Sequence, residues 1–542
     1  MLGLILSIVA LVGVTFVSAG SSSNGGHPDP NLTVKTRTGV FVGDYNDTYP
    51  DVRQFKYIPY AKPPVGPLRW ASPEHLDDSG EVIDSTTYGP SCPQYVSAIP
   101  AVWGLNITGN LIVNYGQSLF DGRAAQNSAE DCLSLAIWTP ANASSNNADD
   151  DGKKQLLPVV IYFTGGGDQT GGINIPTQLP SQWVHRSQRH IVVTTNYRVN
   201  IFGNPHALGL DGNGNFGRQD QRAAVEWVAE NIEVFGGDPT RMTLWGQSAG
   251  AIAADEYLFA FPENPLVRAA ITSSGSALMS FGSRDHEGAN FTFVAKSLGC
   301  DFGDNKGREL ECMRRVPFQR ISNFVGQYQD NSTLVNPSQS PITFSSQSDE
   351  KWVFSNYTQR YLEGKVAKIP TIVGTTAREG SALAYVPLSN YTAGPSEDTV
   401  VRGTLRFVCP SYESSVARDR LGLATYRYHW AGDFANLGPV PWLGAYHYSD
   451  LYMVFGSYGI APGEIPPLEV ETSEAMQDYF LDFVTDPDSL AGKGWPQYHA
   501  GSASEGGTLA QFGAHGKAVE LVTGDSVEGA CHIPGVEYNT RP

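Results

Sequence analysis

The chain has 542 residues, of which 41% are apolar and 17% charged, and its formal net charge is -19. Such a composition is that of a globular protein with a large core, and the acidic excess argues against nucleic acid or an anionic membrane as a partner. Length alone does not decide between several small domains and one large α/β unit.

The N-terminus predicts a secretory signal peptide over residues 1–19. Residues 2–17 are almost wholly apolar, and small residues stand at 17–19, where a signal peptidase would cut. Because only the amino terminus supplies positive charge before this run, a signal anchor is the alternative. Residues 20–30 are expected to be a flexible linker, and residues 31–542 a single domain. No later stretch has membrane-spanning length, so no stable membrane insertion is expected after signal removal.

Secretion predicts disulfides and N-linked glycans. The spacing of the cysteines does not choose among their possible pairings. Some of the Asn-x-Ser/Thr sequons are expected by chance in a chain of this length. The cysteines are Cys92, Cys132, Cys300, Cys312, Cys409 and Cys531. The sequons begin at Asn31, Asn46, Asn106, Asn142, Asn290, Asn331, Asn356 and Asn390.

Alternating apolar runs and helical patterns predict an α/β fold. The runs at 157–163 and 191–198 are apolar enough for strands that are buried on both faces of a helix-covered parallel sheet. Further strands are expected at 39–43, 55–61, 135–138, 242–245, 269–271, 370–373 and 425–430, a polar loop at 142–154, and helices over 219–235 and from 249. Since no internal repeat or domain-scale linker interrupts this alternation, one large α/β domain is predicted.

The sequence Gly-Gln-Ser-Ala-Gly at 246–250 follows a short apolar strand and precedes a helical pattern. This layout is typical of a nucleophile elbow, in which the serine stands at a strained strand-to-helix turn. Residues two before and two after the serine crowd together there, which favours glycine at both positions. The same motif is also typical of an ordinary glycine-bracketed turn. As a nucleophile, Ser248 would need a base and donors for the oxyanion that it creates.

The glycine run Gly165–Gly167 directly follows the predicted strand 157–163. A run of this kind either forms a tight loop or points backbone N–H groups at one oxygen. In combination with a downstream elbow, it predicts an oxyanion hole formed by the N–H groups of Gly165, Gly166 and Ala249.

Among eleven histidines, His447 is the candidate base, because it lies in a loop just before the apolar run 451–456. His429 lies inside a predicted strand and is expected to belong to the core. Glu379, just beyond the strand 370–373, is the candidate acid. Serine, acid and histidine then follow one another in the chain order of α/β-hydrolases.

With these motifs in place, the chain resembles the type-B carboxylesterase/lipase family, which includes fungal lipases, animal carboxylesterases and cholinesterases. The matching segments are 55–66, 130–133, 196–198, 220–221, 231–239, the elbow, 274–276, 379–380 and 495–498. The resemblance implies an α/β-hydrolase fold, with a large, mostly parallel mixed sheet flanked by helices and a disulfide-closed, lid-like loop. It implies Ser248 as nucleophile, His447 as base and Glu379 as its partner. It also implies the disulfides Cys92–Cys132, Cys300–Cys312 and, as in cholinesterases, Cys409–Cys531.

The chain departs from the family pattern at three positions, two of which bear on the substrate. Thr164 replaces the usual histidine before the glycine run, which leaves the backbone donors intact. Gln247 replaces a common glutamate, so a negative charge beside the nucleophile is absent. Gly122 stands where cholinesterases have a tryptophan that stacks on choline. Neutral esters are therefore expected rather than cationic choline esters.

The predicted function is that of a secreted serine carboxylesterase, with no cofactor or metal, acting on a small-molecule or lipid ester. Residues 98–105 are apolar enough to cover a pocket, to meet lipid or simply to pack on the domain, and the sequon at Asn106 disfavours deep burial in lipid. A lipase with an interfacial lid and a metabolite-specific biosynthetic esterase or acyltransferase are the alternatives. A non-catalytic, neuroligin-like interaction protein is a further one, although such proteins typically lose the nucleophile.

Overall fold

A computed structural model gives the arrangement of the chain. The predicted signal peptide, nearly all of the linker, most of the polar loop 142–154 and the sequon at Asn106 lie outside the residues that it describes. Those residues are 30–105, 107, 120–143, 155–212, 214–279, 282, 283, 285, 287–334, 336, 338–386, 388–500 and 507–533.

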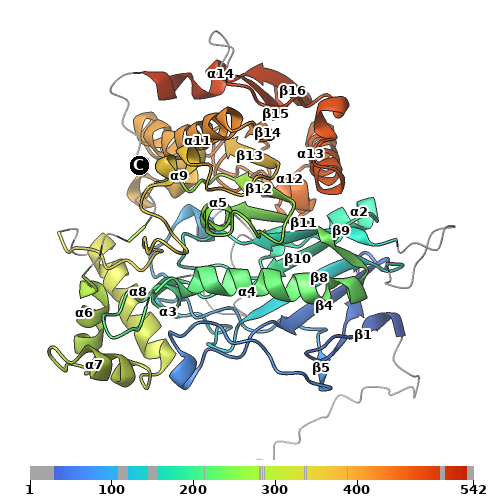
Figure 1. Cartoon of the computed structure of the whole chain (residues 1–542). Coiled ribbons are helices and arrows are strands. Elements are labelled where there is room, and N and C mark those ends of the chain that lie inside the picture. The colour runs from blue at the N-terminus through green and yellow to red at the C-terminus, as the bar shows by residue number, and fades with distance from the viewer. Residues whose placement is uncertain are drawn as a thin grey trace, which may run out of the picture.

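An eleven-stranded mixed sheet runs through the molecule in the order β16-β15-β14-β13-β12-β11-β9-β10-β8-β4-β3 (Figure 1). The pairings from β15 across to β10 are parallel, and those at the two edges are antiparallel. The strands are β3 Asp44–Tyr45, β4 Val52–Pro59, β8 Ser134–Pro140, β9 Leu157–Phe163, β10 Ile191–Thr195, β11 Gly237–Gln247, β12 Ala269–Ser273, β13 Thr371–Thr376, β14 Thr425–Trp430, β15 Thr508–Ala514 and β16 Lys517–Thr523.

Strand β9 illustrates why the sheet is buried on both faces. Its side chains alternate, so that Val160 and Tyr162 join one core cluster and Ile161 and Phe163 join the other. The first cluster includes residues of α2 Ser181–Ser187, α12 Leu451–Phe455 and α13 Pro467–Thr485. The second includes residues of α4 Phe216–Asn231 and α5 Ala249–Ala260. Helices therefore cover both faces, which is what a continuous apolar strand requires.

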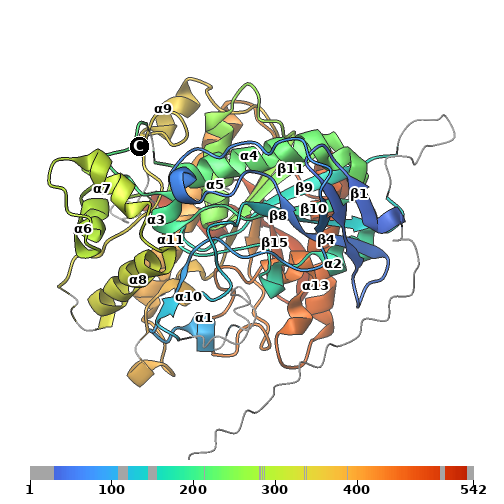
Figure 2. The ribbon, with the colours of Figure 1, turned by 90° about the horizontal axis from the view of Figure 1, so that it is seen from below.

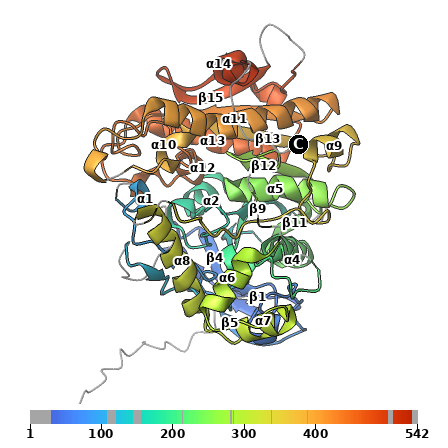
Figure 3. The same cartoon turned by 90° about the vertical axis from the view of Figure 1, so that its left-hand side faces the viewer.

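The remaining helices and two small sheets lie outside the eleven-stranded sheet. Figures 2 and 3 show α8 close to α1 and α10, and Figure 3 shows α11 crossing the upper part of the molecule. The other helices are α1 Val102–Leu105, α3 Asn200–Gly203, α6 Ala289–Ser297, α7 Lys306–Met313, α8 Phe318–Leu334, α9 Tyr357–Leu362, α10 Glu379–Leu383, α11 Glu397–Arg420 and α14 Asp525–Glu528. The small sheets contain β1 Thr33–Lys35, β2 Val40–Val42 and β5 Val82–Asp84, and β6 Tyr95–Val96 and β7 Arg123–Ala124.

The α/β fold is confirmed, and the differences from the expected elements are local. The strand predicted at 39–43 is β2, which belongs to a small separate sheet. The helix predicted over 219–235 ends at Asn231 and continues as a 3₁₀ turn, Ile232–Phe235. The edge hairpin β15–β16 was not predicted, because its strands contain glycine and alanine and lack a continuous apolar run. In the described part of the chain, no helix combines the length and apolar character needed to cross a bilayer.

Candidate active site

Ser248 stands at the corner between β11 and α5, with φ 57° and ψ -125°. A positive φ at a residue other than glycine is strained. The crowding expected around this corner is present. A Cβ atom on Gly246 would collide with the carbonyl oxygen of Gly250, and one on Gly250 would collide with that of Phe163. Only glycine fits at either position, and the close packing fixes the serine at the carboxyl end of the sheet.

Glu379 and His447 are brought together from two different loops. Glu379 is the first residue of α10, just beyond β13, and His447 lies between β14 and α12. The residues that precede them, Arg378 and Tyr446, form an isolated parallel bridge, in which the Arg378 N–H donates to the Ala445 carbonyl at 3.0 Å. This backbone contact holds the two loops in register.

The imidazole and the carboxylate form a short buried contact. His447 Nδ1 lies 2.5 Å from Glu379 Oε2, and the other oxygen, Oε1, accepts the Thr376 N–H at 2.8 Å. Both side chains are buried. Since the carboxylate accepts the proton of Nδ1, the other ring nitrogen, Nε2, is left as the atom that can accept a proton.

Ser248 and His447 line one cavity of about 490 Å³, together with Gly165 and Gly166. In the described contacts, Ser248 Oγ makes no hydrogen bond to His447. Instead, the Gln247 amide nitrogen lies 3.2 Å from His447 Nε2. Catalytic hydrogen bonds in a free enzyme often form only when substrate binds, so this geometry is compatible with a serine–histidine pair.

The three predicted oxyanion donors lie at the same end of the sheet. Gly165 and Gly166 follow β9, and Ala249 opens α5. Within the described residues, none of their N–H groups donates a hydrogen bond to another protein group. Thr164, at the position of the family's histidine, accepts the Tyr197 hydroxyl through its carbonyl at 2.5 Å, which anchors the start of the run.

His429 occupies β14, as expected for a core residue, and it is buried. Burial lowers the pKa of His429 to about 4, because the charged imidazolium would lose its hydration. The hydroxyl of Thr375 lies 3.5 Å from its Nδ1. The ring is therefore neutral and buried within the sheet.

One buried acid near the site was missed by the sequence analysis. Asp450 lies three residues after His447 and accepts the Tyr428 hydroxyl at 2.6 Å. Burial raises the pKa of Asp450 to about 6, and the nearby Glu379 charge acts in the same direction. An aspartate directly before an apolar run is usually a helix cap, so the sequence holds no signal that would have placed it behind the base.

The loop closed by the Cys92–Cys132 disulfide forms one wall of the cavity. The first part of this loop is held to α8 by Asp330. The Asp330 carboxylate accepts the Tyr95 hydroxyl at 2.9 Å, the Ser97 hydroxyl at 2.6 Å and the Ala98 N–H at 2.7 Å. Trp103 on α1 packs with its ring 6.0 Å from that of Tyr448, next to the candidate base. The described part of the loop thus contacts the site directly.

The disulfides and the sequon asparagines are the remaining predicted positions. The two remaining disulfides pair as the resemblance implies, Cys300 with Cys312 and Cys409 with Cys531. Five sequon asparagines are exposed: Asn31, Asn142, Asn331, Asn356 and Asn390. Asn46 and Asn290 are partly buried, and the Asn46 amide nitrogen donates to Gln54 and Ser181, both at 3.1 Å. Glycan attachment remains a prediction at every sequon.

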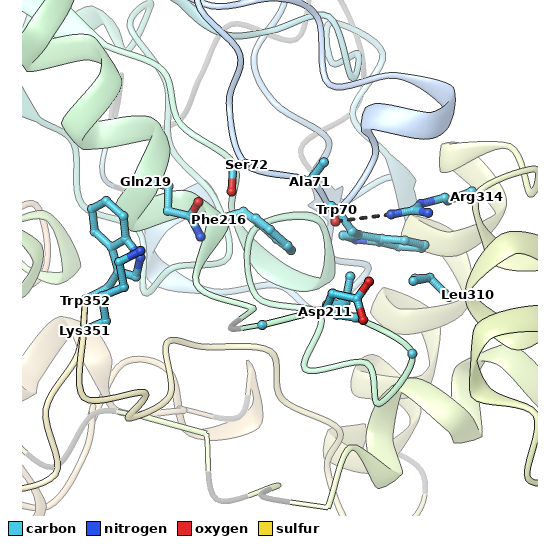
Figure 4. Close-up of a pocket in the computed structure, with 13 residues that line it drawn as sticks. Trp70, Ala71, Ser72, Asp211, Phe216, Gln219, Leu310, Arg314, Lys351 and Trp352 are labelled. Atoms are coloured by element: carbon cyan, nitrogen blue, oxygen red, sulfur yellow. Dashed lines mark hydrogen bonds between the residues drawn. The ribbon is translucent and has the colours of Figure 1, made fainter.

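A second cavity, of about 390 Å³, lies beside α7 (Figure 4). Trp70, Asp211, Arg314 and Trp352 contribute to its wall. The Arg314 guanidinium donates to the carbonyl of Trp70 at 3.5 Å, so one of its N–H groups is already hydrogen-bonded to the wall of the cavity. No histidine is among the described residues that line this cavity, so it lacks the base that acyl transfer requires.

The mostly parallel sheet with helices on both faces, and a serine elbow at the carboxyl end of its central strand, define an α/β-hydrolase. The comparisons with known proteins specify the family. A model of the carboxylesterase family matches residues 30–403. The chain belongs to the carboxylesterase family and is a carboxylic ester hydrolase.

Three relatives illustrate the range of the family. The chain is 36% identical over 544 residues to secreted lipase 5 of Gibberella zeae, with 97% of this chain and 98% of the relative covered. It is 38% identical over 518 residues to chlorogenic acid esterase of Aspergillus niger, with 92% and 94% covered. It is 31% identical over 366 residues to cholinesterase of Mus musculus, with 66% and 55% covered.

Proposed function

We propose that the protein is a secreted serine carboxylesterase that hydrolyses neutral esters through Ser248, His447 and Glu379. The observation that carries this proposal is the convergence of parts in one cavity. Ser248, His447 and the glycine run all line it, and Glu379 supports the imidazole from behind. Nucleophile, base, orienting acid and backbone donors are the parts that acyl transfer needs.

In the first half of the reaction, Ser248 Oγ attacks the ester carbonyl carbon while His447 Nε2 takes the hydroxyl proton. The carbonyl oxygen becomes an oxyanion, which the N–H groups of Gly165, Gly166 and Ala249 stabilise. The carbon–oxygen bond to the alcohol then breaks, and His447 returns the proton to the departing alkoxide. The products of this half are a free alcohol and an acyl group on Ser248.

In the second half, His447 Nε2 takes a proton from water, and the resulting hydroxide oxygen attacks the acyl carbon. A second oxyanion forms in the same donor site. When it collapses, the bond to Ser248 Oγ breaks and the serine recovers its proton from His447. Glu379 keeps Nδ1 as the donor nitrogen throughout and stabilises the positive imidazolium.

The cavity wall supports neutral esters as substrates. Tyr95, Trp103, Phe120 and Phe407 contribute aromatic side chains, and no Asp, Glu, Lys or Arg is among the described residues that line it. A cationic group would thus lack a carboxylate partner, and a carboxylate would lack a cationic one. The relative named chlorogenic acid esterase supports an esterase rather than a lipase.

A lipase that acts on lipid esters is the second candidate function. Leu383 borders the cavity and is 47% exposed, Leu105 on α1 is 42% exposed, and Tyr385, just beyond α10, is 53% exposed. Exposed apolar side chains of this kind suit contact with an oil surface. The relative named secreted lipase 5 supports the same alternative.

Covalent labelling tests the mechanism. A fluorophosphonate probe should label the protein, and Ser248→Ala should remove the label and lower kcat/KM for a nitrophenyl ester by about 10⁴-fold or more. Ser72→Ala, at a serine that lines the other cavity, is the matched control and should retain label and turnover. An unlabelled wild-type protein would favour a non-catalytic interaction protein instead.

A chain-length series of nitrophenyl esters separates the two candidate substrates. An esterase should turn over the short, soluble esters and gain nothing when an oil interface is added. Activation at the interface together with a preference for long acyl chains would identify a lipase. Transfer of the acyl group to an added alcohol in place of water would identify an acyltransferase.

Secretion is proposed from the apolar N-terminus, the three disulfides and the relative that is named as secreted. Oxidising compartments are where such disulfides persist. N-terminal sequencing of the protein recovered from the culture medium should begin after residue 19. Retention of the full chain in the membrane fraction would support the signal anchor.

A further inference from the structure

Gln247 lies between the nucleophile and the base. It is the last residue of β11, directly before Ser248, and its side chain is 2% exposed. Its amide nitrogen lies 3.2 Å from His447 Nε2, and its amide oxygen packs so closely on Gly165 that a Cβ atom there would lie 2.5 Å away. The carboxamide is therefore confined between the base and the glycine run.

The proton positions in this contact follow from the other side of the ring. Glu379 accepts the proton on His447 Nδ1, so Nε2 carries a lone pair when the ring is neutral. An amide N–H can donate to that lone pair, but it would oppose a proton on the same nitrogen. Hydrogen bonding of this kind favours the neutral form of the base over the charged form.

We propose that Gln247 is a positioning residue that holds His447 neutral and oriented in the free enzyme, which extends ester hydrolysis to mildly acidic pH. In the free enzyme the Gln247 amide N–H donates to His447 Nε2, which is the nitrogen that must accept the proton of Ser248 during the reaction. When substrate binds, the Ser248 hydroxyl replaces the amide at Nε2. This inference rests on the proposed function of the same site and adds a role for the residue next to the nucleophile.

Other ionisable groups face the base as well. Glu379 on α10 contacts Nδ1, and Asp450, directly before α12, lies close enough to Glu379 and His447 for their charges to act on it. His429 on β14 interacts electrostatically with Glu379, and Tyr448 is the next residue after the base and lines the same cavity. None of these groups changes when position 247 is substituted, so an altered pH profile reports on the contact at Nε2.

The pH profile of kcat/KM for a short neutral ester, measured between pH 4 and pH 9, tests the inference. In Gln247→Glu, the carboxylate cannot donate to Nε2 and attracts a proton to it, so the acidic limb should move to higher pH by about 1 pH unit. Gln247→Met keeps the length of the side chain without the donor, and its acidic limb should move in the same direction by a smaller amount.

Gln178→Glu is the matched control, because Gln178 is a buried glutamine that lines the same cavity and makes no described contact with His447. It should move the acidic limb less than Gln247→Glu does. An acidic limb of Gln247→Met that coincides with that of the wild type would overturn the inference, because Gln247→Glu also adds a charge beside the base. Such a result with normal fluorophosphonate labelling would leave the proposed function standing, whereas loss of labelling in the wild type would remove the function itself.

Discussion

The nucleophile side of the candidate site is built from backbone, whereas the base side is built from side chains. Around Ser248, Gly246 and Gly250 pack so closely on main-chain atoms that neither position has room for a Cβ atom. Around His447, one backbone contact sets the register of the two loops, and the position of the ring then depends on side-chain hydrogen bonds, chiefly the contact with Glu379. Substitutions around Ser248 are therefore expected to change stability and activity together, whereas substitutions around His447 can lower activity at unchanged stability.

Among the substitutions that test this comparison, the largest effect is expected from Glu379→Gln. The amide would leave Nδ1 without a carboxylate and would destabilise the imidazolium, so kcat/KM should fall by about 10³–10⁴-fold. The side chain keeps its size, so the Tm should change little. Steady-state kinetics and thermal unfolding measure the two quantities. Glu469→Gln, at another buried glutamate, is the control and should leave kcat/KM unchanged. An activity within tenfold of wild type would contradict the role given to Glu379.

Gly246→Ala tests the nucleophile side. The added Cβ meets the carbonyl oxygen of Gly250, so the corner must open and the serine must move. A displacement of about 1 Å costs about 10²-fold in rate, and the Tm should fall at the same time. Gly492→Ala, which adds a Cβ into open space, should change neither. If Gly246→Ala lost activity at an unchanged Tm, the proposed link between fold and chemistry would be wrong.

Asp330→Ala tests the wall of the cavity, with a smaller effect. Tyr95 and Ser97, which line the cavity, would lose their shared acceptor on α8. We expect KM for bulky esters to rise a few-fold while kcat for a nitrophenyl acetate stays near wild type, because the reacting groups are not touched. Asp304→Ala, at an exposed aspartate, is the control. Equal losses for bulky and small esters would speak against a role in substrate fit.

Asp450→Asn tests the buried aspartate near His447, and we expect it to change the pH dependence of the Tm. Burial raises the pKa of Asp450 to about 6, above its ordinary value near 4 in an unfolded chain. The folded state therefore holds the proton more tightly, and stability is lost as pH rises from about 4 through 6. The amide has no such cost and still accepts the Tyr428 hydroxyl. Relative to wild type, the Tm of the variant should rise by about 2 °C between pH 4 and pH 7. A pH-independent difference would refute this.

The sequence predicted the parts of the site that depend on neighbours along the chain. The elbow and the glycine run were recognisable because backbone sterics demand glycine at fixed offsets from the serine and from the end of β9. Gln247 also stood out in the sequence, but only because it replaces a glutamate and so removes a negative charge beside the nucleophile. Its contact with His447 joins residues 200 positions apart in the chain, which no local pattern encodes.

The sequence by itself determined the α/β architecture, the corner that carries Ser248 and the chain order of serine, acid and histidine. These follow from periodicity and from local backbone geometry, which act over a few residues. The family resemblance already implied that Glu379 partners His447 and that the disulfide-closed loop is lid-like. Only the tertiary structure gave the hydrogen bond between the two side chains, the burial of Asp450 near them and the contact of the loop with the cavity. Those facts depend on how β13, β14 and α8 pack, because distant loops meet only when the sheet orders its strands side by side.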